Sequence, residues 1–274
     1  MKKYTFIILF IGVATCFSQN NNYFDVNYRA IYSVNYQPDS TDVKSKINGL
    51  LFTLLIGKNE SVYADKNKIL LDSILIGVEK GKIRPDYVLS NLNSVPKPVS
   101  NAKIIKNKNE NKIFYIDNIS SQTYIYSEKL NLMKWNIKED TASISNYKCQ
   151  KAETFYAGRK YVAWFTTEIP FSDGPYKFNG LPGLIINLSD SKKHFEFTLI
   201  KFEKTDNLKM PTSIEKPVKI SKRKYYMLRD SYFSNPIPFM ESEGAVFDEE
   251  NRKKIIEIFK KRKKQNNNPI ELEY

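Results

Sequence analysis

The sequence has few of the residues from which metal sites and catalytic centres are most often built. Its 274 residues include one histidine, His194, and two cysteines, Cys16 and Cys149. These counts exclude zinc sites with two or three histidines and clusters of thiolates. A Ser-His-Asp system would have to use His194, which follows two lysines in SKKHFEF and which we interpret as a solvated surface imidazole. We therefore expect no metal and no cofactor.

Beyond its N-terminus the sequence also lacks any apolar run near the roughly 20 residues of a membrane-spanning helix. The N-terminus itself, MKKYTFIILFIGVATCFSQN, has two lysines, then a nearly continuous apolar stretch from Tyr4 to Phe17, then the small Ser18. This pattern predicts a secretory signal peptide over residues 1–18, and a short N-terminal anchor helix is the alternative. We expect an exported protein of the periplasm or cell envelope, with no membrane span in the mature chain.

A lipid anchor and a disulfide framework are not expected. A lipoprotein signal would need a small residue before the lipidated cysteine, but Thr15 precedes Cys16. Removal of the signal peptide would leave Cys149 alone, and we interpret it as a small buried side chain of a strand.

Acidic residues are outnumbered, since 43 Lys and Arg face 30 Asp and Glu for a formal charge of +13. A basic surface attracts anions, and for an exported protein we expect an anionic membrane surface before nucleic acid. The candidate anion-binding residues lie in FDEENRKKIIEIFKKRKK and are Lys253, Lys254, Lys260 and Lys261. The alternative is that lysines are simply spread over a solvated surface.

Most of the chain reads as strands joined in hairpins. YKCQKAETFYAG and RKYVAWFTT are expected to pair around Ala157-Gly158, and LIINLSD is expected to pair with KHFEFTLIKFEK. Successive hairpins predict a curved antiparallel meander, with a half-barrel as one form of it. The predicted fold class is mainly β with a few helices (α+β), in which the helices pack on one side of the sheet and residues 19–274 form a single domain.

Three segments have helical patterns, namely Lys66–Lys82, Lys219–Phe233 with Ser221 as a possible N-cap, and Phe247–Lys264. In the last, acidic residues begin the segment and lysines end it, which suits the helix dipole. NLNSVPKPVSN, Asn91–Asn101, reads as a linker inside the domain.

The most unusual stretch is GPYKFNGLPGLIINLSD, Gly174–Asp190, because a loop rich in Gly and Pro is here largely apolar. Pro182-Gly183 fits the centre of a type II turn, with glycine taking the positive φ. The loop is either a buried corner, with its apolar side chains under the sheet, or an exposed apolar lip at a binding site. The candidate binding residues are Phe178, Leu181, Pro182, Leu184 and Trp164.

Three carboxylates flank this loop and could form an acid/base pair, namely Glu168, Asp173 and Asp190. Nothing in their spacing requires that role, because acidic residues beside turns usually stabilise the turn itself.

The segment RKYVAWFTTEIPFSDGPYKFNGLPGLIINLSD resembles the signature of the GLPGLI family, exported proteins of Bacteroidetes-type bacteria. Gly180–Ile185 matches in full the hexapeptide that names the family, and YKCQKAETFYAGR and the terminal NNPIEL are also similar to it. The family has no established activity, so the resemblance implies a location and a length, and it transfers no catalytic residue.

Together these features favour an exported binding or interaction protein without catalytic activity, which holds an apolar ligand or docks an envelope protein through Gly180–Ile185. The alternative is a periplasmic hydrolase that uses the carboxylates beside the loop. An apolar cavity near Leu181 would favour binding, whereas two buried carboxylates facing one cleft would favour catalysis.

Overall fold

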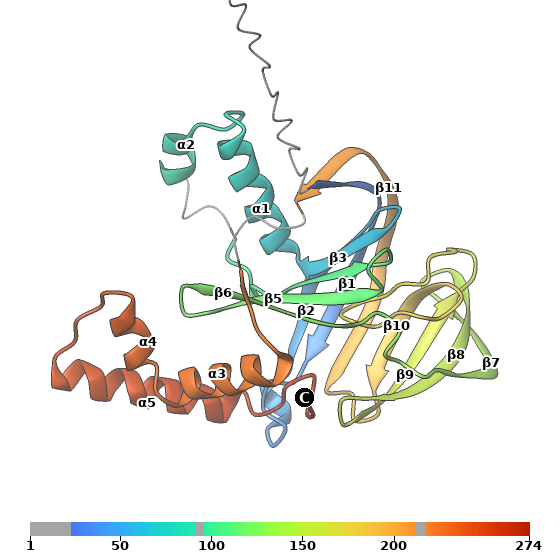
Figure 1. The fold of residues 1–274 in the computed structure, drawn as a ribbon. Helices are drawn as coiled ribbons and strands as arrows, with labels where there is room; N and C mark the ends of the chain where they lie inside the picture. Colours follow the sequence, from blue (N-terminus) through green and yellow to red (C-terminus); the bar gives the residue numbers. More distant parts are fainter. Residues whose placement is uncertain (1–22, 91–95, 212–216) are drawn as a thin grey trace, which may run out of the picture.

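The protein is mainly β (Figure 1). The computed structural model describes residues 23–90, 96–211 and 217–274, so the predicted signal peptide and the first half of the predicted linker lie outside the described residues. Within the described residues, twelve strands form one sheet in the order β12-β6-β5-β4-β3-β2-β1-β11-β10-β9-β8-β7. The strands are β1 (Tyr23–Tyr36), β2 (Ile47–Ile56), β3 (Glu60–Asp65), β4 (Lys103–Asn107), β5 (Lys112–Ile119), β6 (Gln122–Lys129), β7 (Asn136–Ile144), β8 (Tyr147–Tyr156), β9 (Arg159–Thr166), β10 (Leu184–Asp190), β11 (Phe195–Pro211) and β12 (Val218–Lys219).

The sheet consists of two antiparallel meanders that meet at its longest strands. Strands β1 to β6 follow one another, strands β7 to β11 do the same, and β1 pairs with β11 along nearly its whole length. Among the strands of the described residues, only the short contact of β12 with β6 is parallel. Strands β12 and β7 are the two edges, so the sheet is open and not closed into a barrel.

The hairpin expected at Ala157-Gly158 forms between β8 and β9. Both turn residues have positive φ, 47° for Ala157 and 80° for Gly158. Two positive φ angles give the turn a twist that matches the twist of the paired strands.

All three predicted helices are present, with slightly different ends. They are α1 (Lys66–Glu79), α3 (Lys222–Ser234) and α5 (Glu249–Gln265), and Ser221 caps α3 as expected by accepting a hydrogen bond from the Lys224 N–H. The sequence analysis missed two helices of one to two turns, α2 (Pro85–Ser90) and α4 (Ile237–Ser242), and the 3₁₀ turn Val43–Ser45. No helix among the described residues has the length and apolarity needed to cross a membrane.

The prediction that the helices pack on one side of the sheet is not confirmed. Leu54 and Leu55 are neighbours on β2, so their side chains point to opposite faces. Leu54 belongs to the main core, whereas Leu55 belongs to a small cluster with Ile69 of α1. Helix α3 packs its tyrosines on Tyr126 of β6. Directly paired residues of neighbouring strands lie on the same face, and such pairs connect Leu54 of β2 through β3, β4 and β5 to Tyr126. Tyr126 therefore lies on the face of the main core. Helices α1 and α3 therefore contact opposite faces.

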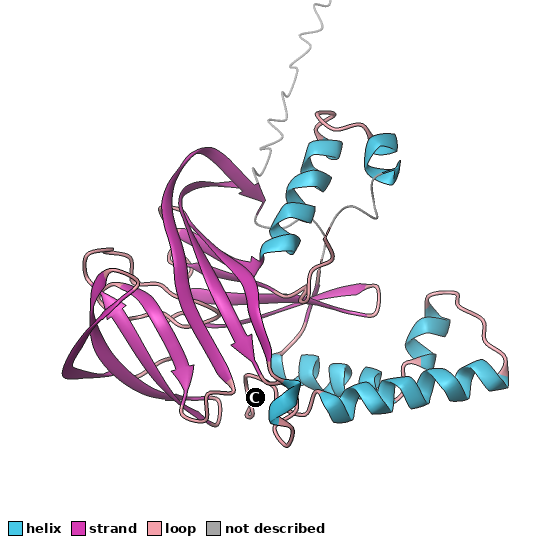
Figure 2. Ribbon diagram, turned by 180° about the vertical axis from the view of Figure 1, so that it is seen from behind, coloured by secondary structure: helices cyan, strands magenta, loops and turns pink. Residues whose placement is uncertain are grey.

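One core lies inside the bend of the sheet, and it unites side chains from both meanders. It includes Tyr32 and Leu54 from the first meander and Tyr161 and Leu188 from the second, all fully buried. Figure 2 shows the two halves of the sheet turned toward each other around the long central strands. The concave face is thus the one that holds the loop between β9 and β10.

Candidate functional site

The loop between β9 and β10, residues 167–183, is a buried corner and not an exposed lip. Of the candidate binding residues, Phe178, Leu181 and Leu184 have at most 1% of their surface exposed and belong to the main core. Trp164 is half-buried, and only Pro182 is exposed. The apolar letters of the hexapeptide are therefore explained by packing, which was one of the two readings that the sequence left open.

Two of the three glycines of this corner, Gly180 and Gly183, show that the turn differs from the predicted one. Gly183 does not take a positive φ, so the predicted type II turn is wrong, and it is Gly180 that has a φ of 95°. Gly183 lets the backbone of the loop pack directly against the backbone of Thr166, because a Cβ there would lie 2.0 Å from the carbonyl oxygen of Thr166. Proline and glycine here allow the chain to turn directly against the end of β9.

Lys106 of β4 anchors the first half of the loop from the opposite meander. Its buried ammonium group forms an ion pair with Asp173 and donates hydrogen bonds to the carbonyl oxygens of Gly174 and Phe178, at 2.6 and 3.2 Å. Burial lowers the pKa of Lys106, and the Asp173 carboxylate opposes that effect. Asp173 is therefore a structural counter-charge that sequence analysis had considered as a catalytic acid.

The second half of the loop carries a fully buried lysine, Lys177. Its ammonium group forms ion pairs with Glu271, at 2.5 Å, and with Glu128 of β6. Lys222, at the start of α3, completes the group at 2.8 Å from Glu128 and 2.6 Å from Glu271. We call these four residues the Lys177 cluster. Its two positive and two negative charges come from four separate parts of the chain.

Tyrosine rings pack around Lys177, a fully buried member of this cluster. The Lys177 ammonium lies 4.9 Å from the centre of the Tyr126 ring and 5.5 Å from that of Tyr176. It also donates a hydrogen bond of 3.0 Å to the Tyr126 hydroxyl, while the Tyr176 hydroxyl donates one to Glu271. Although burial alone would raise the pKa of Glu271, the two lysines outweigh it and lower the pKa. The two ammonium groups thus favour the ionised form of Glu271 despite its burial.

Glu271 belongs to the C-terminal tail, residues 266–274, which follows α5 and lies across the end of the core. Arg159 of β9 donates a hydrogen bond of 2.7 Å to the Pro269 carbonyl oxygen, and the Tyr161 hydroxyl donates one of 3.1 Å to that of Ile270. The Leu272 N–H pairs with the Ala157 carbonyl oxygen. The NNPIEL segment, which the sequence analysis noted beside the hexapeptide, is therefore in direct contact with the same corner of the fold.

The three carboxylates considered for catalysis are separated and individually engaged. Asp173 pairs with Lys106, while Asp190 pairs with Arg159 and accepts a hydrogen bond from the Phe195 N–H. Glu168 is exposed and accepts one from the Lys148 N–H. In the described part of the chain no group of three or more His, Cys, Asp or Glu side chains could hold a metal ion.

Neither His194 nor Cys149 has the setting of a catalytic group. His194 is half-buried at the start of β11, and its carbonyl oxygen accepts a hydrogen bond from Gln37. Cys149 is buried in β8 as expected, and burial raises the pKa of its thiol. A raised pKa makes the thiol a poor nucleophile at neutral pH.

The candidate anion-binding lysines Lys253, Lys254, Lys260 and Lys261 are all exposed on α5. Helix α5 packs on α3 and extends beyond the sheet (Figure 1). Lys254 forms an ion pair with Glu250 one turn before it, and Lys260 lines a shallow hollow beside Lys263. No structural feature gathers the four around one point.

The concave face has a cavity of about 340 Å³ beside the Lys177 cluster. We call it the concave pocket. Its walls come from one face of β1 to β5 and β11, from α3 and from the C-terminal tail. The wall is mostly apolar and aromatic, and includes Tyr36, Leu50, Phe52, Tyr63, Ile104 and Phe197. Tyr176 of the loop also lines it, so the pocket adjoins the corner without opening onto Leu181.

Arg229 of α3 is the cation of the concave pocket that has no ion-pair partner in the described residues. Its guanidinium lies 5.5 Å from the Phe233 ring centre, and the side chain is half-buried. Glu271 also lines the pocket, but its charge is balanced by Lys177 and Lys222. The pocket is therefore a mostly apolar space with one guanidinium at its side, which attracts Asp117 but forms no close ion pair within the described residues.

Comparisons with known proteins support the expected kind of protein only in part. Residues 155–187, which contain the end of β8, β9, the whole corner and the start of β10, match the model of a family described as "Protein of unknown function (Porph_ging)". No curated protein matches the sequence. The match does not separate the GLPGLI family from others, so that assignment remains a prediction.

Two crystal structures of PNGF-II, in different space groups, have a similar fold. Their TM-scores are 0.51 and 0.52 at 11% and 12% identity, and the likeness covers 74% and 75% of this chain. The chain spans about a third of the length of PNGF-II, since 33% of that chain is covered in each case. At this identity the likeness concerns the fold alone.

Sequence reasoning missed the Lys177 cluster and the C-terminal tail as parts of the site. One signal was available, because a lysine between Tyr176 and Phe178 in an apolar loop needs a counter-charge if the loop is buried. The sequence could not say which acidic residues supply it, since Glu128 and Glu271 lie 49 and 94 positions away from Lys177.

Replacing Gly183 by alanine is expected to destabilise the fold by about 3 kcal/mol or more, because the added Cβ has no space against the backbone of Thr166. Urea unfolding of the purified protein measures this free energy. The control is Pro182→Ala at the exposed neighbouring position, which should cost much less. Equal losses in the two variants would contradict the close-approach role of Gly183.

Replacing Lys177 by methionine is expected to lower the free energy of unfolding by about 3–5 kcal/mol, since it leaves Glu271 with reduced compensation in a buried site. The double variant Lys177→Met/Glu271→Gln removes one charge of each sign and should be more stable than the sum of the two single effects predicts. Lys254→Met, in an exposed pair, should change stability by less than about 0.5 kcal/mol. Strictly additive losses would mean that the two buried groups are not coupled.

Stability should also fall in acid because of Glu271. Its pKa is lower in the folded protein than in the unfolded chain, so its contribution is complete above the unfolded value of about 4.3 and is lost as the pH falls through the folded pKa. Glu271→Gln should therefore differ most from the wild type at neutral pH and converge with it in acid. Unfolding measured from pH 7 downward tests this, with the exposed Glu257→Gln as control. A constant difference at every pH would contradict the assignment.

Proposed function

We propose that this is an exported binding protein of the cell envelope, without catalytic activity, which holds an apolar ligand in the concave pocket. The observation that carries the proposal is the pocket itself, with its aromatic and aliphatic wall and one unpaired cation. Its volume of about 340 Å³ lies within the range of small-molecule sites.

The proposal moves the ligand away from the Gly180–Ile185 loop, because the apolar side chains of that loop are already used in the core. The loop has a supporting role instead. It places Tyr176 in the wall of the pocket and Lys177 beside Glu271, and the tail that carries Glu271 forms another wall. A rigid, preformed wall binds more tightly because less motion is lost on binding.

Arg229 gives the ligand a direction. An apolar molecule with an acidic end group would place its hydrocarbon part along Phe52 and Leu50 and its anionic end toward the guanidinium. We therefore favour a medium-chain carboxylate or a similar amphiphile over a fully apolar ligand. A basic protein with a formal charge of +13 also attracts such anions over a longer range.

Export is supported by the N-terminal pattern of two lysines followed by an apolar stretch. The alternative, a hydrolase built on Asp173, Asp190 or Glu168, receives no support from the geometry. Two of these carboxylates are buried counter-charges to Lys106 and Arg159 and the third is exposed, so no pair faces one cleft.

The test measures the binding of decanoate to the purified protein by native mass spectrometry and calorimetry. Decanol serves as the uncharged comparison ligand. Leu50→Glu, which puts a charge into the apolar wall, should abolish the binding of both probes. Leu51→Glu is the matched control, because the next residue of β2 points to the other face. Arg229→Gln should weaken the affinity for decanoate by about tenfold and leave the affinity for decanol unchanged.

Binding that survives Leu50→Glu with the fold intact by circular dichroism would place the ligand elsewhere. Equal weakening of both probes by Arg229→Gln would contradict the orientation of the acidic end.

A further inference from the structure

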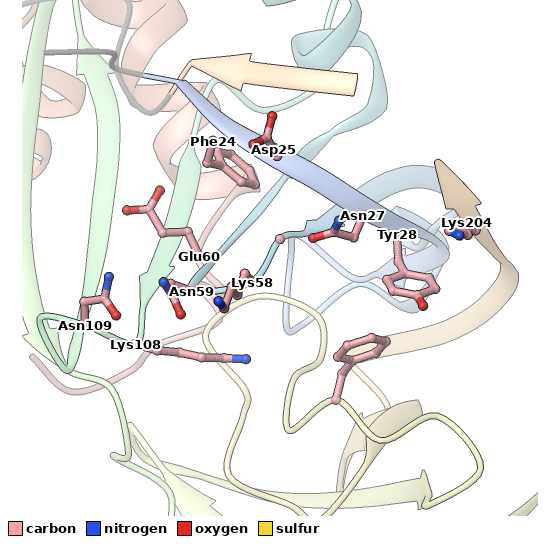
Figure 3. A pocket seen from close by; sticks show the side chains of 12 residues that line it. Phe24, Asp25, Asn27, Tyr28, Lys58, Asn59, Glu60, Lys108, Asn109 and Lys204 are labelled. Carbon is pink, nitrogen blue, oxygen red and sulfur yellow. The ribbon is translucent and has the colours of Figure 1, made fainter. Parts of the chain in front are cut away.

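A second cavity lies on the other side of the corner, and it differs from the concave pocket in its chemistry. Its volume is about 810 Å³. It is formed by the start of β1, the turn between β2 and β3, the turn between β4 and β5, Phe171 of the loop, and β11 (Figure 3). We call it the lysine pocket, after Lys58, Lys108 and Lys204 in its wall.

The three lysines carry uncompensated charge. In the described part of the chain none of them forms an ion pair with a carboxylate, although the neighbouring Lys201 and Lys209 of β11 do. Figure 3 shows Lys58 and Lys108 extending from the two turns toward the same space, and Phe171 is another residue of the wall. All three lysines are exposed, so their ammonium groups are accessible to a bound anion.

The two acidic residues of the wall do not neutralise this charge. Asp25 forms an exposed ion pair with Lys209, on β11. Glu60 accepts a hydrogen bond of 2.6 Å from the Asn107 side chain, and burial raises the pKa of its carboxyl, with Glu110 adding to the effect. Because three lysines face two carboxylates in the wall, and Asp25 already pairs with Lys209, the formal charge of the lysine pocket is positive.

The two turns that carry the lysines are fixed in place. The Lys108 N–H donates a hydrogen bond of 2.8 Å to the Asn59 carbonyl oxygen, which ties one turn to the other. Gly57 lets the first turn approach β1 closely, since a Cβ there would lie 2.5 Å from the Asp25 carbonyl oxygen and 2.9 Å from the Phe24 ring. The positions from which both lysines extend are thus set by the fold and not by loose loops.

An aromatic wall stands opposite the lysines. The Tyr28 and Phe171 rings lie 4.9 Å apart in a tilted arrangement, and Tyr28 also stacks on Phe202 at 5.4 Å. Tyr28 and Phe171 are each only half-buried, so part of their ring surface faces the pocket. An exposed aromatic wall beside free cations suits a ligand with one flat apolar part and one charged part.

We propose that the lysine pocket is a second binding site, for an organic anion that carries an aromatic group. Lys58 and Lys108 face the anionic group, and the Tyr28 and Phe171 rings contact the aromatic group. The site is independent of the concave pocket, because the two cavities share no wall residue.

The test uses phenyl phosphate as the probe, with inorganic phosphate and phenol as its two halves, and measures dissociation constants with the full chain by ligand-observed NMR. Phenyl phosphate should bind at least about tenfold more tightly than either half, since it satisfies both the cations and the rings. Its affinity should fall as salt is added, because the charges are exposed to solvent.

The variant Lys58→Gln/Lys108→Gln should weaken phenyl phosphate by about tenfold or more. The control Lys253→Gln/Lys254→Gln removes the same charge from exposed positions on α5 and should leave the affinity unchanged. Arg229→Gln should also leave it unchanged, because Arg229 lines the concave pocket.

Four results would overturn the proposal. An unchanged affinity for phenyl phosphate in the Lys58→Gln/Lys108→Gln variant would show that the probe does not bind in the lysine pocket. An equal loss of affinity in the α5 control would show that the probe is attracted by the general charge of the surface. A loss in Arg229→Gln alone would place the probe in the concave pocket. Binding of inorganic phosphate as tight as that of phenyl phosphate would exclude a contribution from the rings.

Discussion

The arrangement of this fold depends on the need of one buried ammonium group, that of Lys177, for counter-charges. A lysine with no exposed surface is tolerated only if ion pairs and hydrogen bonds replace its water. Here β6 supplies Glu128, the tail supplies Glu271, and Lys222 of α3 balances the second carboxylate. Because these groups come from distant parts of the chain, satisfying one charge fixes the loop, the tail and the first turn of α3 relative to the sheet.

The same constraint explains why the sheet can stay open and still enclose a core. An open sheet with a strong bend leaves its concave face to be filled. The loop between β9 and β10 fills it with Phe178 and Leu181, and Lys106 holds that loop from the opposite meander. Arg159, paired with Asp190, holds the tail in turn. These ion pairs and hydrogen bonds thus fix the position in which the apolar loop packs. Hydrophobic contacts alone are less directional and would specify that position less precisely.

The corner also separates two cavities of different character. Tyr176 lies in the wall of the concave pocket and Phe171 in that of the lysine pocket, only five positions earlier in the chain. One cavity is mostly apolar with a single arginine in its wall, and the other is polar with three lysines. A segment that packs rigidly in the middle can present its two ends to two sites, so the signature residues need not touch a ligand themselves.

The sequence by itself determined much of the local structure: most strands, three helices, the Ala157-Gly158 turn and the mainly β class follow from short-range periodicity and turn chemistry. It also predicted that the apolar loop has a defined role, but not whether Leu181 is inside or outside. Only the tertiary structure decided that, together with the partners of Lys177, the use of Asp173 and Asp190 as counter-charges, and the opposite placement of α1 and α3. The physical reason is range, because ion pairs between residues 49 or 94 positions apart, and the face that a helix covers, depend on how the sheet bends and leave no periodic trace in the chain.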